Sequence, residues 1–387
     1  MRRLLVAGLV ACLATGLATP SAMAVGGEQL DQPGIQVNLG TGAQPLPRLK
    51  VRTWVIADAT TGQVLAAKRA HKPRPPASTL KTLTALTLLP RLGMDSSVAG
   101  TRKAANSQGA QAGVERGQRY TVEQLFYGMM LPSGNDAAIA LAQANGGVKT
   151  TVAQMNAVAA QLQALNTRAR TPNGLDSPGQ TSSAYDLALI ARAGLARPDF
   201  TTIVSTKRSS FPSKGGGTRT ITNLNQMLTS GFRAALGVKT GFTTKAGRTF
   251  VGAAARKGHT LIFVGMGIKE ASRTAAEDAL GWGFRNLGKV TPVGTLVEPL
   301  SPLPTSVATV AASAAPIVEQ AAQPMSQADP TLTPDPAASA AISQAALKVP
   351  MAAAQAPSWW LGLIVLVLIG AALLGFNASR NRRRRFR

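Results

Sequence analysis

An uncharged apolar run from Trp359 to Phe376, followed by an arginine-rich tail, constrains this chain more than any other feature. At about 1.5 Å of rise per residue, the run would form a helix about 27 Å long, close to the hydrocarbon thickness of a bilayer. We therefore expect a transmembrane helix over residues 358–376, with the basic tail 377–387 on the cytoplasmic side. A buried core helix is the alternative, but such a helix normally carries a polar face.

The first 24 residues have the three regions of a secretory signal peptide. Arg2 and Arg3 precede an apolar run, and small residues end the segment at Ala24. Cys12 lies inside the apolar run, where lipid attachment is a weaker interpretation. It is the only cysteine, so an exported chain cleaved after Ala24 must be held by core packing without disulfides. Together, the two ends place the intervening chain outside the cytoplasm.

The formal net charge of the 387-residue chain is +24. Arginines of the signal segment and the tail account for part of it, and the body between them is still strongly basic. Such a charge is typical of proteins that bind nucleic acid. The export signals argue against that partner and favour an anionic cell envelope, while a generally solvated basic surface is the alternative.

Composition divides the exported part into three. Residues 25–47 are rich in Gly, Gln and Pro and are expected to form an irregular lead-in. A compact domain is expected over residues 48–290. Residues 291–357 are expected to form a tether, because from position 301 onward Ala, Pro, Ser and Thr dominate and aromatic residues are absent. A passive spacer and a device that reaches into a wall are both consistent with this composition.

Within the compact domain, periodicity predicts strands, then helices, then strands and a final helix. VRTWVIAD and QVLAAKR flank a turn and predict a β-hairpin, and extended segments are expected at 231–241, 248–255 and 259–268. Helical patterns cover 78–89, 121–145, 151–165, 183–195 and 272–286. This order predicts an α/β (α+β) fold in which an antiparallel sheet is flanked by helices and carries a helical subdomain.

Ser78 and Lys81 are three positions apart, at the start of a helical pattern that follows two prolines. On a helix this spacing places both on one face. A neutral lysine can act as the base for a serine nucleophile if burial or another cation disfavours its charged form. Taken alone, the pair is more simply explained by Ser78 capping the helix and Lys81 pointing to water.

Two further motifs follow in order. Ser133-Gly134-Asn135 precedes an alanine-rich helix, and Lys239-Thr240-Gly241 ends an extended segment. The S-x-N pattern is common, since residues 379–381 also match it, but K-T-G occurs once. The ordered set S-x-x-K, S-x-N and K-T-G is the signature of penicillin-binding proteins and serine β-lactamases.

Residues 48–288 resemble the D-alanyl-D-alanine carboxypeptidases, the low-molecular-mass penicillin-binding proteins. The segments that carry this resemblance are YTVEQLFYGMMLPSGNDAAIALA, TPNGLDSPGQTSSAYDLALIA, ITNLNQMLTSGFRAALGVKTGFTTKAGRTFVG and ALGWGF. The resemblance implies a β-lactamase/transpeptidase-like fold. It also implies removal of the terminal D-alanine from peptidoglycan stem pentapeptides at the bacterial cell membrane, no cofactor, and inhibition by β-lactam antibiotics.

The resemblance also implies roles for residues of the first two motifs. Ser78 would be the acylated nucleophile, and Lys81 would be its base. Ser133 would relay a proton toward the leaving amine, and Asn135 would hold both the substrate amide and the Lys81 amine.

For the third motif, the resemblance implies that Lys239 and Thr240 meet the carboxylate of the departing D-alanine. Gly241 leaves the strand edge open to an extended substrate. Phe242 replaces a histidine often found in the family, but its expected role is that of a backbone oxyanion donor together with the Ser78 N–H. Arg273 is a candidate second contact for the carboxylate.

Other activities are less consistent with the residues present. Efficient β-lactamases use a glutamate between S-x-N and K-T-G, and this chain has none between Glu123 and Glu270. A Ser-His-Asp hydrolase or a metal enzyme would depend on His71 and His259, which lack the motifs those sites require. A silent wall-binding homologue and an endopeptidase acting on crosslinks stay open. The sequence indicates no oligomeric state.

Two features depart from the common plan of the family. We expect the tether, rather than a second β-domain, after Phe284. We also expect a transmembrane span where many relatives use an amphipathic surface helix. Neither difference touches the catalytic motifs.

Overall fold

The computed structural model describes residues 25–305. The expected signal peptide, most of the expected tether, the transmembrane helix and the basic tail lie outside the described residues. Between residues 25 and 305, no helix combines the length and apolar character needed to cross a membrane.

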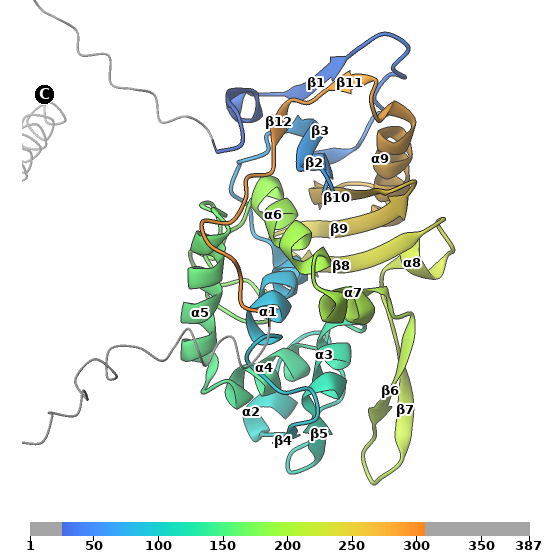
Figure 1. Ribbon diagram of the computed structural model, residues 1–387. Coiled ribbons are helices and arrows are strands. Elements are labelled where there is room, and N and C mark those ends of the chain that lie inside the picture. Colours follow the sequence, from blue (N-terminus) through green and yellow to red (C-terminus); the bar gives the residue numbers. More distant parts are fainter. Residues whose placement is uncertain (1–24, 306–387) are drawn as a thin grey trace, which may run out of the picture. The chain divides into compact units, whose positions relative to one another are not determined.

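An antiparallel sheet forms the centre of the domain (Figure 1), with the strand order β11-β1-β3-β2-β10-β9-β8 and β12 paired to β3. Its strands are β1 (Ile35–Leu39), β2 (Val51–Asp58), β3 (Gln63–Lys68), β8 (Ala235–Thr243), β9 (Gly247–Arg256), β10 (His259–Ile268), β11 (Val290–Thr291) and β12 (Gly294–Thr295). Two small two-stranded sheets stand apart from it: β4 (Ser97–Ala99) with β5 (Arg119–Thr121), and β6 (Arg208–Pro212) with β7 (Thr218–Thr222).

Both faces of the sheet are apolar, because its central strands are hydrophobic at successive positions. In β10, Leu261 and Phe263 belong to one core cluster, while Ile262 and Val264 belong to the other. Successive side chains of a strand point to opposite faces. The sheet is therefore covered on both sides, as the predicted fold class requires.

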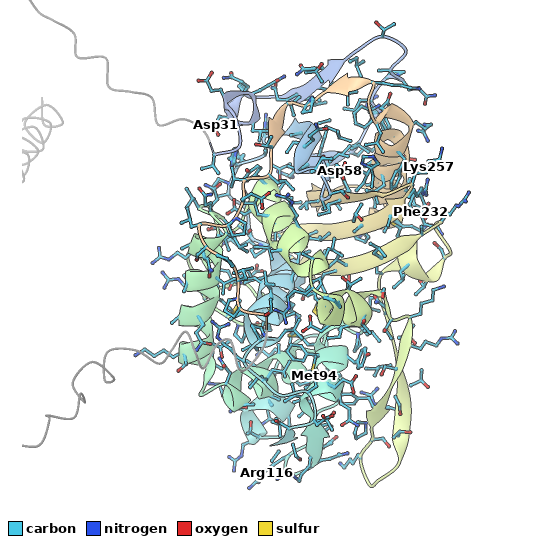
Figure 2. All side chains as sticks on the ribbon, viewed as in Figure 1. Asp31, Asp58, Met94, Arg116, Phe232 and Lys257 are labelled. Atoms are coloured by element: carbon cyan, nitrogen blue, oxygen red, sulfur yellow. The ribbon has the colours of Figure 1, made fainter. Side chains whose placement is uncertain are left out.

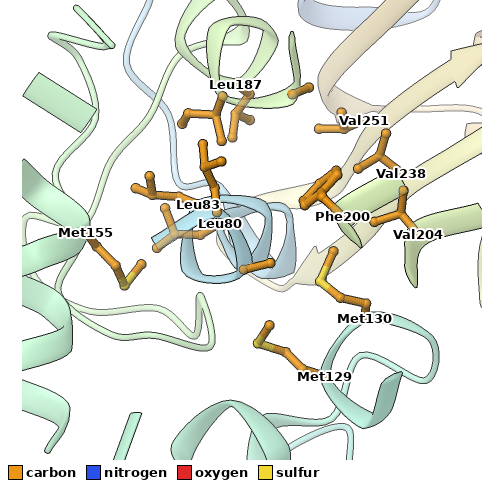
Figure 3. Close-up of a cluster of buried hydrophobic side chains, with 14 of the residues drawn as sticks. Leu80, Leu83, Met129, Met130, Met155, Leu187, Phe200, Val204, Val238 and Val251 are labelled. Atoms are coloured by element: carbon orange, nitrogen blue, oxygen red, sulfur yellow. The ribbon is translucent and has the colours of Figure 1, made fainter. Parts of the chain in front are cut away.

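Helix α9 (Ser272–Asn286) covers one face and contacts the short α8 (Gln226–Thr229), whose Met227 belongs to the same core cluster (Figure 1). The other helices lie on the opposite side or beyond it: α1 (Lys81–Leu88), α2 (Arg102–Ala105), α3 (Val122–Met130), α4 (Asn135–Ala144), α5 (Val148–Gln161), α6 (Ala184–Leu195) and α7 (Pro198–Ser205). The described chain also has 3₁₀ turns η1 (Glu28–Asp31) and η2 (Ala77–Leu80). All eight residues of α1 are buried. Figure 3 shows side chains of α3, α5, α6, α7, β8 and β9 converging around α1.

The helical pattern predicted over 121–145 is divided into α3 and α4, and the break falls at the S-x-N motif that the sequence places before an alanine-rich helix. Helix α3 begins with a capping box, in which Thr121 and Gln124 exchange side-chain and backbone hydrogen bonds. The break falls at residues 131–134, where Ser133 has φ +67° and cannot continue a right-handed helix. Periodicity alone did not reveal this break, because the apolar pattern continues on both sides of it.

The predicted hairpin of β2 and β3 is confirmed, and α9 covers residues 272–286 as predicted. The predicted pairing of β9 with β10 is also confirmed. Its turn contains Lys257, labelled in Figure 2, and Gly258, both with positive φ. Two positive φ values in a short turn match the right-handed twist of the flanking strands.

The domain is longer at both ends than the expected 48–290. The lead-in 25–47 is not irregular throughout, because β1 pairs with β3 and with β11. After position 290, β12 pairs with β3, and Val293 and Leu296 are buried in the core. These short strands carry a weak sequence pattern. Their structure comes from backbone hydrogen bonds to a strand that would otherwise be exposed at its edge.

Candidate active site

Ser78 and Lys81 lie where the 3₁₀ turn η2 passes into α1. In a 3₁₀ turn, residues three apart are nearly eclipsed. The Lys81 Nζ atom accordingly lies 3.0 Å from the Ser78 Oγ atom. Ala77, just before the serine, has φ +51°, a conformation that a residue with a side chain rarely adopts.

Lys81 is fully buried, although it carries an amine. Burial lowers its pKa well below the ordinary value, and the nearby charge of Lys239 lowers it further, while Asp136 opposes the shift. Desolvation disfavours the ammonium form because its hydration is lost. The site therefore favours a neutral amine, the form that can accept a proton.

The partners of the Lys81 amine determine the direction of its lone pair. Nζ lies 2.7 Å from Asn135 Oδ1 and 2.7 Å from the Asn173 backbone oxygen, and both of these atoms can only accept hydrogen bonds. Asn135 Nδ2 donates to the Gln108 backbone oxygen at 2.6 Å, which orients the amide so that Oδ1 faces the lysine. A neutral amine that donates both hydrogens to these oxygens directs its lone pair toward the Ser78 hydroxyl.

Ser133 lies between α3 and α4 and contributes to the same cavity as Ser78. Its Oγ atom is buried and has no hydrogen-bond partner among residues 25–305. Such a hydroxyl is costly to bury unless a ligand completes its hydrogen bonding. Its position and its free hydrogen-bonding capacity fit a group that meets a substrate.

Lys239 and Thr240 lie on β8, at the edge of the sheet. Thr240 lines the cavity, whereas Lys239 is buried beside it and its Nζ atom donates to the Thr240 backbone oxygen at 3.1 Å. Burial lowers the pKa of Lys239 to about 7. The lysine is therefore a source of positive charge that depends on pH near neutrality.

Gly241 permits the close packing of β8 against the nucleophile turn. A Cβ atom at this position would lie 2.4 Å from Thr249 Oγ1 and 2.9 Å from the backbone nitrogen of Ser78. Any larger residue would therefore push the strand away from the serine. A glycine was expected here because it leaves the strand edge open to substrate. Its close approach to the Ser78 backbone N–H is a second reason for a residue without a side chain.

The cavity has a volume of about 440 Å³. Of the residues singled out from the sequence, those that line the cavity are Ser78, Ser133, Thr240, Gly241, Phe242 and Arg273. Lys81, Asn135 and Lys239 are buried around it. Phe242 has a side chain that is 66% exposed, which fits an expected contribution from its backbone alone. The Arg273 Nε atom also lies 3.7 Å from Glu277 Oε1, one helical turn further along α9.

Sequence reasoning missed the loop that supplies the Asn173 carbonyl. In this loop, Gly174 has φ +80°, and a Cβ there would lie 2.1 Å from the Ala77 backbone oxygen. The loop thus packs directly on the nucleophile turn. The Asn-Gly pair was a turn signal, but the hydrogen bond from the Lys81 amine to the Asn173 backbone oxygen, 92 residues away, leaves no trace in a local pattern.

Asp136 was also missed. It is buried, and its carboxylate accepts hydrogen bonds from the backbone N–H groups of Ala112, Gly113 and Val114. These bonds fix the segment that carries Gln108, the partner of Asn135. An aspartate in the first turn of a helix is common enough that its position gave no specific signal.

No cluster of three or more His, Cys, Asp or Glu side chains between residues 25 and 305 could hold a metal ion. A serine beside a buried lysine with a lowered pKa is the arrangement found in serine acyl-transfer enzymes that use a lysine as base. The fold and the order of the three motifs are those of the transpeptidase and β-lactamase-like members of this class.

Comparisons with known proteins agree. The model of the D-alanyl-D-alanine carboxypeptidase family, peptidase S11, matches residues 40–270. The D-alanyl-D-alanine carboxypeptidase DacB2 of Mycobacterium tuberculosis is 42% identical over 262 residues, which cover 66% of this chain and 89% of DacB2. The chain belongs to the D-alanyl-D-alanine carboxypeptidase family, as the sequence predicted.

Solved structures support the same fold. A D-alanyl-D-alanine carboxypeptidase from Mycobacterium tuberculosis is 39% identical, with a TM-score of 0.60, and the match covers 68% of this chain and 99% of that one. The DD-transpeptidase of Streptomyces K15 is 30% identical, with a TM-score of 0.59 and coverages of 62% and 99%. The matched part corresponds to the catalytic domain.

Proposed function

We propose that Ser78 is the nucleophile with which this serine-type D-Ala-D-Ala carboxypeptidase removes the terminal D-alanine of peptidoglycan stem peptides. The observation that carries the proposal is the geometry of Lys81. Its buried amine has a lowered pKa and donates to two carbonyl oxygens, which leaves its lone pair for the Ser78 hydroxyl.

In the acylation step, the Ser78 Oγ atom attacks the carbonyl carbon of the penultimate D-alanine, and its proton passes to Lys81 Nζ. The backbone N–H groups of Ser78 and Phe242 would stabilise the resulting oxyanion. The C–N bond then breaks, and Ser133 would relay the proton from Lys81 to the leaving amine. An ester on Ser78 and free D-alanine result, and water hydrolyses the ester.

Recognition of the terminal carboxylate would come from the β8 side of the cavity. Thr240 and Arg273 line the cavity and can contact the carboxylate directly. Lys239 lies behind Thr240 and supplies positive charge from within the protein rather than from the cavity wall. A site that requires this anion favours a chain end over an internal peptide bond.

β-Lactams would acylate the same serine. Hydrolysis of this acyl-enzyme would be slow, because the chain has no glutamate between the S-x-N and K-T-G motifs to activate water as in efficient β-lactamases. Peptidoglycan lies outside the cytoplasm, so the catalytic domain works there. We further propose that residues 1–24 direct export, that residues 358–376 cross the membrane once, and that the Ala/Pro-rich segment before them is a tether. The tail 377–387 would then be cytoplasmic.

The test is mass spectrometry of the chain before and after penicillin treatment, combined with D-alanine release from a pentapeptide. We expect one penicillin adduct on Ser78, and neither the adduct nor D-alanine release in a Ser78→Ala variant. Ser107→Ala, which changes a serine that does not line the cavity, is the matched control. D-Alanine release by Ser78→Ala at the rate of the unmodified protein would refute the mechanism.

A further inference from the structure

A second hollow, here called the basic groove, lies near the start of β2 and the end of β10. Its volume is about 540 Å³, and eight of its eleven lining residues are Lys or Arg. It shares no lining residue with the active-site cavity. The two are neighbours along the chain, because only Glu270 separates Lys269 of the groove from Ala271 of the cavity.

Three of these cations stand in a row along one segment of the chain. Arg48, Lys50 and Arg52 alternate with apolar or small residues, and extended backbone places alternate side chains on one side about 6.7 Å apart. The backbone of Lys50 continues the sheet pairing, since its oxygen accepts from the Lys269 N–H at 2.9 Å. The groove therefore presents charge at regular intervals along one line.

A glycine allows two arginines to meet in the groove. Gly267 lies across from Arg52 in the sheet, and a Cβ there would lie 2.7 Å from Arg52 Cδ and 3.1 Å from Arg74 Nη2. The Arg74 Nε atom is buried and has no hydrogen-bond partner within residues 25–305. Burial and the charge of Arg52 both lower the pKa of Arg74. The protein thus places two like charges together and leaves hydrogen-bonding capacity unused.

Between residues 25 and 305, no ion pair joins a lining residue of the groove to a carboxylate. The ion pairs in that range involve Arg192, Arg197, His259 and Arg273, none of which lines the groove. The carboxylate of Glu270 accepts a hydrogen bond from the Lys50 backbone N–H at 2.8 Å. A concave surface lined by one sign of charge concentrates the field and attracts an opposite charge.

We propose that the basic groove binds a linear anionic polymer that carries phosphate groups. Guanidinium groups match phosphate with paired hydrogen bonds, and a regular row of cations suits a chain with repeated charges. A bilayer surface is a poorer fit, because it is flat and would touch only the rim of a hollow. A polymer held here would keep the catalytic cavity close to the envelope without occupying it.

The test measures binding of fluorescently labelled sodium polyphosphate to the full-length protein in neutral detergent micelles, at several salt concentrations. The groove variant combines Lys50→Gln, Arg52→Gln and Lys72→Gln, which are all exposed positions. The control variant removes the same charge elsewhere, with Arg102→Gln, Lys103→Gln and Lys149→Gln on exposed positions of α2 and α5. We expect about a hundredfold weaker binding for the groove variant and a flatter salt dependence.

Equal weakening by the control variant would overturn the proposal, since it would show binding by net charge alone. Stronger binding of poly-L-glutamate than of polyphosphate, or displacement of polyphosphate by phosphatidylglycerol added to the micelles, would also overturn it in favour of a carboxylate polymer or a lipid surface. Penicillin acylation of Ser78 is measured in parallel. It should be the same in both variants, so a failure of the groove proposal is distinguishable from a failure of the proposed catalytic mechanism.

Discussion

The two faces of the central sheet are built from different chemistry. Between the sheet and α9 lie large buried apolar side chains, including Trp54 and Phe263 from the sheet and Trp282 from the helix. On the side of α1, the protein buries the amines of Lys81 and Lys239 beside apolar residues. Burial of apolar surface stabilises the fold, whereas burial of an amine disfavours its charge. The comparison teaches that both faces bury apolar residues, but the α1 face also holds two buried amines whose pKa values are lowered.

The sharpest test of this difference is Lys81→Met. Removing the base should lower the rate of D-alanine release by about 10⁴-fold, as for loss of a member of a coupled catalytic set. The free energy of unfolding should change by less than about 2 kcal/mol. Burying methionine avoids the cost of desolvating an amine, and this offsets the loss of the amine's hydrogen bonds. Kinetics and urea unfolding of the same preparation measure both, with the exposed Lys149→Met as control. A fully active Lys81→Met protein would contradict the assigned base.

The opposite pattern is expected on the α9 face. Trp282→Ala should cost about 4 kcal/mol of unfolding free energy, because it leaves a large cavity in a close-packed core and removes the hydrogen bond from its Nε1 to the Gln44 backbone oxygen. The fraction that is folded should keep near-normal kcat and KM. Phe284→Ala on the same helix, at a half-buried position, should cost much less. A selective loss of kcat in folded Trp282→Ala would show that the two faces are coupled.

The smallest expected effect concerns pH. The pKa of Lys239 is lowered from 10.5 to about 7 by burial, so in the free enzyme its positive charge is present below that pH and lost above it. kcat/KM should therefore fall on the alkaline side, by at most about tenfold per pH unit. The lowered pKa of Lys81 gives the acid limb, because the base must be neutral. An arginine keeps its positive charge over this pH range, so Lys239→Arg should remove the alkaline limb of the kcat/KM profile. If that limb is unchanged in the variant, the titrating group is not Lys239.

Local patterns were enough for the long regular elements and for the chemical groups. VRTWVIAD and QVLAAKR on either side of a turn predicted β2 and β3, and the limits of α9 could be read from its periodicity, because both are properties of short segments. The three motifs named the residues around the cavity before their positions were known. The short strands β1, β11 and β12 could not be predicted, since they exist only through pairing with β3 or with each other.

By itself, the sequence determined which groups are available: a serine and a lysine three positions apart, two further polar motifs, and an apolar framework that can carry them. The tertiary structure decided what those groups can do. Burial and the charge of Lys239 lower the pKa of Lys81, and the carbonyl oxygen of Asn173, brought in from 92 positions away, accepts a hydrogen bond from its amine. A side chain specifies a functional group, but its pKa and its hydrogen-bond partners depend on neighbours that only the folded chain assembles.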